Sequence, residues 1–384
     1  MNNCSIDRER LAKGFMRLCE IDSPSRQERG VADYLTKVFT ELGAEAVIED
    51  NSAEKTGADC GNLLIRFPGT AAREPIFFAC HMDTVEPGCG IEVLRSGDIF
   101  TSLGNTILGG DDKSGIAALI EMMAVLQENE SLYGPVEILL TTCEEIGLLG
   151  AKHFDAKRLQ ATYGYALDST GINRVIVGAP AANRLKIQVH GIAAHAGLNP
   201  EHGISAFCLA ARAIADLRLG RLDEQSTANF GLIHGGVATN IVPDLITLEG
   251  EVRSHSLQKL DEYTEEIKRA FHKVVRGGTT QAVGVKQPSV DIIVEMEYPA
   301  MHIEESDPVL ARVRQAGEYL QREILFQVAG GGSDANIFNS YGLKTAIIAT
   351  GMDKVHTTDE CLDLNDLVSL TELLLAITLV APSP

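Results

Sequence analysis

Several apolar runs in this 384-residue chain end at side chains that can bind a metal ion, and this recurring pattern limits the fold more than any other feature. The run Ile76–Cys80 is followed by His81, with Asp83 two residues later. Acidic residues follow two later runs in the same way: Glu144 and Glu145 after Val136–Thr142, and Asp168 after Tyr163–Leu167. In parallel α/β sheets, ligands bind beyond the carboxyl ends of the strands, so residues far apart in sequence can converge there. The pattern therefore predicts such a sheet, with a metal site at the strand ends.

The pair His81-x-Asp83 is the first candidate for a metal ligand with its supporting group. A histidine that binds a metal through one ring nitrogen usually donates its other N–H to a carboxylate, and we expect Asp83 to orient His81 in this way. Two further candidates lie in loops. Asp111 follows a glycine-rich segment that enters a helix, and His356 follows a late strand.

Helical patterns lie between the strands. Leu11, Phe15 and Leu18 recur at helical spacing. The segment Ser25-Arg-Gln-Glu28 matches a capping box, so we expect it to open the next helix, which Gly43 closes. Alternation of strands and helices predicts an α/β fold with a doubly wound, mainly parallel sheet.

The pattern changes near Pro180. From there to residue 298 the expected order is strand, helix, two strands, helix and strand, which is the ferredoxin-like βαββαβ arrangement. We therefore expect an inserted domain over residues 180–298, and a discontinuous metal-binding domain built from residues 1–179 and 299–384.

Composition excludes some classes of function. The chain has 33 basic and 53 acidic residues and a formal charge of -20, so it lacks the basic clusters that bind nucleic acid. None of its eight cysteines forms a C-x-x-C pair, and most lie in apolar segments, which indicates a reducing compartment. The apolar stretch Leu362–Pro382 is interrupted by polar residues, so we expect an amphipathic helix there and no membrane span. These features predict a cytoplasmic protein that binds neither nucleic acid nor membrane.

Taken together and in order, the motifs resemble a known family. They are His81-x-Asp83, Gly110-Asp-Asp-Lys113, Glu144-Glu-Ile-Gly147, Asp168, Gly191-x-x-Ala-His195-Ala-Gly197, Asn240-Ile-Val-Pro-Asp244, Glu251-Val-Arg253 and His356-Thr357. Over its whole length the chain resembles the dizinc peptidase family of peptidase T, carboxypeptidase G and the aminoacylases, with forms most similar to those of peptidase T and its relatives.

The resemblance implies two divalent metal ions. Asp111 would bridge them, His81 and Asp168 would complete one site, and Glu145 and His356 would complete the other. A carboxylate is well suited to bridging two metals, and mixed histidine and carboxylate ligation suits Zn, with Co or Mn as alternatives.

The neighbouring glutamates need different roles. Adjacent side chains of a regular strand point to opposite faces, so a turn is needed to bring both towards the metals. With Glu145 as the ligand, Glu144 would face the bridging water as general base and pass its proton to the leaving amine.

The resemblance also implies roles outside the metal-binding domain. His195, in the inserted domain, would stabilise the tetrahedral oxyanion in the active site of a partner subunit, which implies a homodimer formed through that domain. Asn240 and Arg253 would hold the substrate backbone or its carboxylate, and Gly331 and Gly332 would offer backbone N–H groups near the substrate.

Three functions agree with these observations. The first is a peptidase that cleaves short peptides, in particular a tripeptide aminopeptidase, and the second is an N-acyl-amino-acid amidohydrolase or carboxypeptidase with the same chemistry. The third is a non-catalytic metal-binding protein, which the full set of ligands together with Glu144 and His195 argues against. An aminopeptidase also needs an acidic group for the substrate ammonium, and the sequence does not identify it.

Overall fold

The computed structural model describes residues 5–277 and 287–380, and the chain divides into two compact units. The larger unit comprises the described residues of Met1–Gly178, Met301–Ala329 and Ser333–Pro384. The smaller unit comprises those of Ala179–Ala300 together with Gly330–Gly332. This tripeptide is the main difference from the expected boundaries, which placed residues 330–332 in the metal-binding domain.

The larger unit contains a nine-stranded sheet in which β6, β3, β7 and β16 are neighbours and run parallel. Its order is β1-β2-β6-β3-β7-β16-β8-β14, with β15 paired to β8. The strands are β1 (Ala46–Glu49), β2 (Leu63–Phe67), β3 (Ile76–His81), β6 (Val136–Thr141), β7 (Tyr163–Ala166), β8 (Arg174–Ala179), β14 (Met301–His302), β15 (Leu325–Val328) and β16 (Lys344–Ile348). The predicted mainly parallel α/β sheet is confirmed, although the sequence analysis did not identify β8 or β14.

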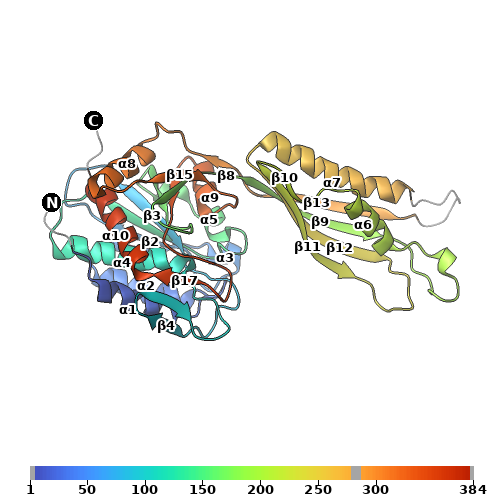
Figure 1. Ribbon diagram of the computed structural model, residues 1–384, viewed down its shortest axis with the longest axis horizontal. Coiled ribbons are helices and arrows are strands. Elements are labelled where there is room, and N and C mark those ends of the chain that lie inside the picture. Colours follow the sequence, from blue (N-terminus) through green and yellow to red (C-terminus); the bar gives the residue numbers. More distant parts are fainter. Residues whose placement is uncertain (1–4, 278–286, 381–384) are drawn as a thin grey trace. The chain divides into compact units, whose positions relative to one another are not determined.

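Helices cover both faces of this sheet (Figure 1). Phe77 of β3 makes an edge-to-face contact with Phe338, whereas the next residue, Phe78, stacks on Tyr165. The Tyr165 hydroxyl donates to the carbonyl of Val309. Because successive strand residues face opposite sides, the helices that carry Phe338 and Val309 lie on opposite faces. The helices of this unit are α1 (Arg8–Cys19), α2 (Arg29–Glu41), α3 (Ala53–Thr56), α4 (Gly110–Glu128), α5 (Leu149–His153), α8 (Pro308–Leu320), α9 (Asp334–Ser340) and α10 (Leu364–Leu379), with a 3₁₀ turn at Ala156–Arg158.

A second, small sheet was not predicted. It consists of β17 (Cys361–Asp363), β5 (Ile99–Ser102) and β4 (Val93–Ser96), in that order. β17 pairs antiparallel with β5 and follows the loop that carries His356. The pairing therefore joins that late loop to an early part of the chain.

The C-terminal helix α10 differs from the amphipathic helix expected from the sequence. From Leu370 to Thr378 nearly every side chain is buried, because α10 packs against α4, α8 and α1 (Figure 1). Its polar Thr371 and Thr378 donate to carbonyls one turn earlier, which lets them be buried without loss of hydrogen bonds. No helix in the described part of the chain is long and apolar enough to span a membrane.

The capping box expected at Ser25–Glu28 is absent. α2 begins at Arg29, and its N-cap residue Glu28 makes no side-chain capping bond. The side chains of Ser25 and Glu28 instead form hydrogen bonds with Asp83 and Cys143, each more than 50 residues away in the sequence.

The smaller unit has a five-stranded antiparallel sheet in the order β10-β11-β12-β9-β13. Its elements are β9 (Ala181–His190), α6 (Ala206–Ala215), β10 (Gly220–Asp223), β11 (Ser226–Gly235), β12 (Leu245–Ser254), α7 (Leu257–Gly277) and β13 (Ser289–Tyr298), with a 3₁₀ turn at Pro200–His202. The predicted βαββαβ arrangement is present, with β10 as an additional edge strand. α6 and α7 pack on one face of this sheet (Figure 1). Leu185, Ile187 and Val189 of β9 are buried with them, while Arg184 and Lys186 are exposed.

Candidate metal centre and active site

His81 ends β3 and is almost completely buried, with 2% of its surface exposed. Its Nδ1 lies 2.9 Å from the backbone carbonyl of Asp83 and 3.6 Å from the carboxylate of the same residue. A carbonyl can only accept, so Nδ1 donates a proton to it, and Nε2, which faces Asp111, is the nitrogen that would bind a metal. The carbonyl and the carboxylate of Asp83 thus both lie on the Nδ1 side of His81, and the carbonyl is the nearer of the two.

Asp111 lies between two histidines at the entrance to α4. Its Oδ1 is 3.0 Å from Nε2 of His81, and its Oδ2 is 3.3 Å from Nε2 of His356. Burial raises the pKa of Asp111, but hydrogen bonds with His356 and His81 outweigh this and hold it below its ordinary value. One carboxylate thus presents each of its oxygens to a different histidine.

Glu145 and His356 form the other side of this cluster. Nε2 of His356 is 3.1 Å from Oε1 of Glu145, and the side chain of His356 is 51% exposed. Hydrogen bonds with Asp111 and Glu145 raise the pKa of His356 to about 10. Ligand atoms of His81, Asp111 and Glu145 all lie within 4.8 Å of one another, close enough to surround an ion.

Glu144 points into a different space from Glu145. It lines a small cavity of about 10 Å³ with His81, Asp112, Asp168 and Asp334. Burial raises the pKa of Glu144 well above its ordinary value, that of Asp168 to about 7 and that of Asp334 to about 6. Oδ1 of Asp334 and Oδ1 of Asp112 are buried without a hydrogen-bond partner, so the cavity concentrates carboxyl groups that lack a compensating cation.

Two buried carboxylates hold the backbone segments that carry these ligands. Asp83 accepts from the N–H groups of Glu144 at 2.9 Å and Glu145 at 3.2 Å. Glu360 accepts from the N–H groups of Leu108 and Gly109, both at 2.8 Å, and from that of Asp111 at 3.1 Å. The backbone on either side of the cluster is therefore fixed by carboxylates that do not themselves face the ligand atoms.

The residues present fit a pair of divalent cations. Imidazole nitrogen and carboxylate oxygen are the donors that zinc, cobalt and manganese accept. Asp111 can serve two ions at once, and the buried, unpartnered oxygens of Asp112 and Asp334 are acceptors whose polarity a nearby cation would balance. The structure brings together the five predicted ligands His81, Asp111, Glu145, Asp168 and His356, together with Glu144, around one region of the larger unit.

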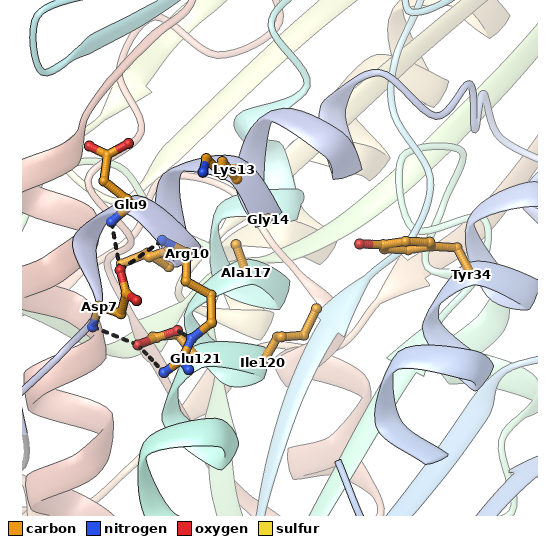
Figure 2. Close-up of a pocket in the computed structure, with 10 residues that line it drawn as sticks. Asp7, Glu9, Arg10, Lys13, Gly14, Tyr34, Ala117, Ile120 and Glu121 are labelled. Atoms are coloured by element: carbon orange, nitrogen blue, oxygen red, sulfur yellow. Dashed lines mark hydrogen bonds and ion pairs between the residues drawn. The ribbon is translucent and has the colours of Figure 1, made fainter. Parts of the chain in front are cut away.

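Two other features of the larger unit gather polar groups or form a hollow. Ligand atoms of Glu28, Asp59 and Cys60 lie within 4.8 Å of one another. A pocket of about 470 Å³ lies among α1, α2 and α4 (Figure 2).

In that pocket Asp7, Glu9, Arg10 and Glu121 already have polar or charged partners. Arg10 contacts Glu121 through Nε at 2.6 Å and Nη2 at 2.9 Å, and Asp7 caps α1 (Figure 2). Glu9 pairs with Arg95. The pocket therefore lacks the convergent metal-binding groups of the His81–His356 region.

In the smaller unit, His195 and Asn240 lie on adjacent loops. The N–H of Ala196 donates to the carbonyl of Asn240 at 2.9 Å, and both His195 and Asn240 are exposed. Nδ1 of His195 accepts from the N–H groups of Gly197 and Leu198, both at 3.2 Å. The neutral ring therefore carries its proton on Nε2, which can donate to a ligand.

Arg253, Gly331 and Gly332 form a second group in the smaller unit. A Cβ atom on Gly331 would lie 3.4 Å from Nη1 of Arg253, and one on Gly332 would lie 2.3 Å from the ring of Tyr298. Arg253 is bound to Glu251, with Nε and Nη2 each 3.0 Å from a carboxylate oxygen. Close packing against Tyr298 thus requires Gly332, whereas a Cβ on Gly331 would make only an ordinary contact, and Arg253 already has a carboxylate partner.

Sequence reasoning missed Glu360, Asp334 and Glu28. Glu360 follows His356 by four residues and Asp334 follows the predicted glycine loop, so both were close to motifs that had been identified. Proximity to a motif was the only sequence signal, because an acidic residue in a loop is ordinarily exposed.

Comparisons with known proteins agree with this geometry. Residues 177–279 match the family model described as a peptidase dimerisation domain of the M20 group, and residues 62–187 match that of peptidase family M28. The chain is similar to the crystal structure of aminopeptidase PepT from Bacillus cereus, with 39% identity, coverage of 97% and 98% of the two chains, and a TM-score of 0.85. It is also similar to that of a tripeptidase from Staphylococcus aureus, with 32% identity, the same coverage and a TM-score of 0.89. The protein YqjE of Bacillus subtilis is 37% identical over 97% of this chain and 98% of its own.

Proposed function

The chain belongs to the M20 family of metallopeptidases, and from this premise we propose that it is a tripeptide aminopeptidase that releases the first residue of short peptides. The observation that carries the proposal is the position of Asp111, whose two oxygens face His81 and His356 separately. Such an arrangement supports a pair of metal ions, with Asp168 completing one site and Glu145 the other. When bound, two metal ions would polarise the peptide carbonyl and lower the pKa of a water molecule.

Glu144 is the proposed general base. It is buried beside His81 but does not share the contact between Glu145 and His356, so its carboxylate remains available for a proton. The cation pair would favour its ionised form, offsetting the effect of burial. Glu144 can then accept a proton from the attacking water and return it to the leaving amine.

His195 is the proposed donor to the oxyanion. Its Nδ1 is occupied by two backbone N–H groups, which leaves the Nε2 proton for the developing negative charge. We propose that it acts in the active site of a partner subunit, within a homodimer formed through the smaller unit. The match of residues 177–279 to a dimerisation domain supports the dimer, as do exposed apolar residues such as Leu232 and Ile233, each 51% exposed.

The substrate-binding proposal concerns Asn240, Arg253, Gly331 and Gly332. Asn240 and the fork of Arg253 would hold the backbone and the carboxylate end of a short peptide, while the two glycines let that peptide approach the chain closely. A substrate carboxylate would have to displace Glu251 from Arg253 or bind the nitrogens that Glu251 leaves free.

Zinc and a cytoplasmic location complete the proposal. Two imidazoles with carboxylates suit zinc, although cobalt and manganese accept the same donors. Cys19, Cys60, Cys80 and Cys143 are buried as free thiols, which agrees with a reducing compartment.

The test is a comparison of blocked and unblocked substrates. Metal-loaded protein should release the first amino acid from free tripeptides and leave their N-acetylated forms intact, as measured by chromatography of the products. Faster turnover of N-acetyl amino acids, or release of the last residue, would transfer the assignment to an amidohydrolase or carboxypeptidase.

A further inference from the structure

The segment Ser25–Glu28 contacts the turn that carries the two neighbouring glutamates. Oγ of Ser25 donates to Oδ2 of Asp83 at 2.6 Å. Oε1 of Glu28 accepts from the N–H of Cys143 at 2.9 Å, from that of Arg26 at 3.0 Å and from the Cys143 thiol at 3.4 Å. The side chains that resemble a capping box are thus directed at the turn, not at α2.

The turn is held at three consecutive backbone positions. The N–H of Cys143 bonds to Glu28, and those of Glu144 and Glu145 bond to the two oxygens of Asp83 at 2.9 and 3.2 Å. Glu28 and Asp83 are both completely buried. Two carboxylates therefore fix three successive peptide units without competition from water.

Cys143 explains why this support is needed. It has a φ of 54°, in the left-handed region that residues with a side chain seldom adopt. This conformation ends the strand alternation after β6, so that Glu145 reaches His356 while Glu144 lines the cavity beside His81. Disfavoured backbone of this kind persists when surrounding contacts determine it.

The backbone next to Ser25 and Asp83 is itself held by hydrogen bonds and a β-bridge. The N–H of Thr84 donates to the carbonyl of Ser23 at 2.9 Å, and Pro24 and Thr84 form a parallel β-bridge. Ser25 and Asp83 therefore face each other across paired backbone. Movement of either would move the hydrogen bonds to Glu144 and Glu145.

We propose that Ser25 and Glu28 are positioning residues for catalysis, which fix the Cys143–Glu145 turn so that one glutamate serves as base and the other as ligand. The inference rests on the proposed function, since it assigns those roles to Glu144 and Glu145. Neither residue touches the reacting atoms. Both act through Asp83 and the backbone of the turn.

Paired variants test this. Glu28→Ala removes the acceptor for Cys143, and Ser25→Ala removes the donor to Asp83. Each should lower kcat by about 10- to 100-fold, because small displacements of catalytic groups have effects of this size, while KM changes by less than about threefold. Glu28→Gln and Ser25→Thr keep the acceptor and the hydroxyl, and they should recover to within about threefold of the wild type in kcat.

Glu137 provides a matched control in the same unit. It is buried, and its Oε2 accepts from the N–H groups of Gln160 at 2.7 Å and Ala161 at 2.9 Å. Glu137→Ala should lower the thermal midpoint to a similar degree as Glu28→Ala, yet leave kcat unchanged. Equal losses of kcat in the two alanine variants would show that Glu28 acts only through general stability and would overturn the inference.

The visible absorption spectrum of the Co²⁺-loaded protein gives a readout that does not depend on the substrate. A displaced turn alters the position of Glu145, so the cobalt bands should shift in Glu28→Ala and Ser25→Ala but not in Glu28→Gln or Glu137→Ala. Unchanged bands in both Ser25→Ala and Glu28→Ala would also overturn the inference. A wild type that binds cobalt but cleaves no tripeptide would instead contradict the proposed function, while the band shifts still decide the positioning role.

Discussion

The two units present their candidate functional groups in opposite ways. In the larger unit His81, Asp111 and Glu144 are at most 8% exposed, and buried carboxylates hold the backbone around them. In the smaller unit His195 and Asn240 are exposed on loops, and backbone hydrogen bonds hold them. Burial is suited to shifting pKa values and binding cations, whereas exposure is suited to meeting a substrate or a partner chain. The difference agrees with a larger unit that can bind the metal ions and a smaller unit whose exposed groups can reach a substrate or a partner chain.

The largest expected effect is on the shared ligand of the larger unit. Asp111→Ala should lose both metal ions and all measurable peptidase activity, because within the described residues it is the one side chain whose two oxygens face both histidines. His81→Ala should weaken mainly one ion. Elemental analysis after gel filtration measures this, and full metal content in Asp111→Ala would show that the bridging assignment is wrong.

A smaller effect is expected when the ligands are kept and the proposed base is changed. Glu144→Gln should retain the fold and both metals but lose roughly 10²–10⁴-fold in kcat, the usual contribution of a positioned general base. Glu145→Gln should lower metal occupancy as well. If metal analysis and kinetics give the reverse result, the roles of the two glutamates must be exchanged.

The exposed group of the smaller unit should affect turnover without affecting metals. His195→Ala should lower kcat by about 10²–10³-fold, as loss of one oxyanion donor does elsewhere, with full metal content. Mixed with Glu144→Gln and allowed to exchange subunits, it should recover about a quarter of wild-type activity, since half the dimers are mixed and each has one intact site. No recovery after proven exchange would mean that His195 serves its own chain.

The smallest expected effect concerns stability and pH. Burial raises the pKa of Asp334 from 3.8 to about 6, so in this window the folded state keeps a proton that the unfolded state has lost. Metal-free protein should therefore become less stable as pH rises from about 4 to about 6, and Asp334→Asn should remove about 1–2 kcal/mol of that loss. Thermal unfolding with a chelator at several pH values measures it. Identical pH profiles for variant and wild type would show that the ionised Asp334 has no such cost.

The sequence was informative where chemistry and strand periodicity coincide. His81 follows a run of buried β3 residues, so its position at the end of the strand could be inferred, and with it the prediction that it is a metal ligand. The same logic led from alternating strands and helices to the sheet that the structure contains. The sequence could not show which group of Asp83 supports His81, because the carbonyl and the carboxylate of Asp83 are both acceptors near Nδ1 of His81.

Predictions from local sequence patterns were wrong where contacts with residues distant in the sequence determine the structure. Ser25 and Glu28 have the spacing of a helix cap, but Asp83 and Cys143, brought close by the fold, provide stronger partners. α10 carries polar residues that suggested an exposed face, yet helices on several sides bury it. Such outcomes depend on tertiary packing, which a window of neighbouring residues does not contain.

The placement of α10 also affects the order in which the protein forms during synthesis. α4, near the middle of the first half of the chain, is completed by packing against α10, and the Arg73 and Arg312 side chains bond to the last carbonyls of α10. The smaller unit, almost continuous from Ala179 to Ala300, has all its strands and helices translated before Met301–Pro384 leaves the ribosome. At ordinary elongation rates that interval lasts on the order of ten seconds. During this time the apolar surface of α4 lacks its partner α10, whereas the smaller unit already has all the strands and helices that its own core needs.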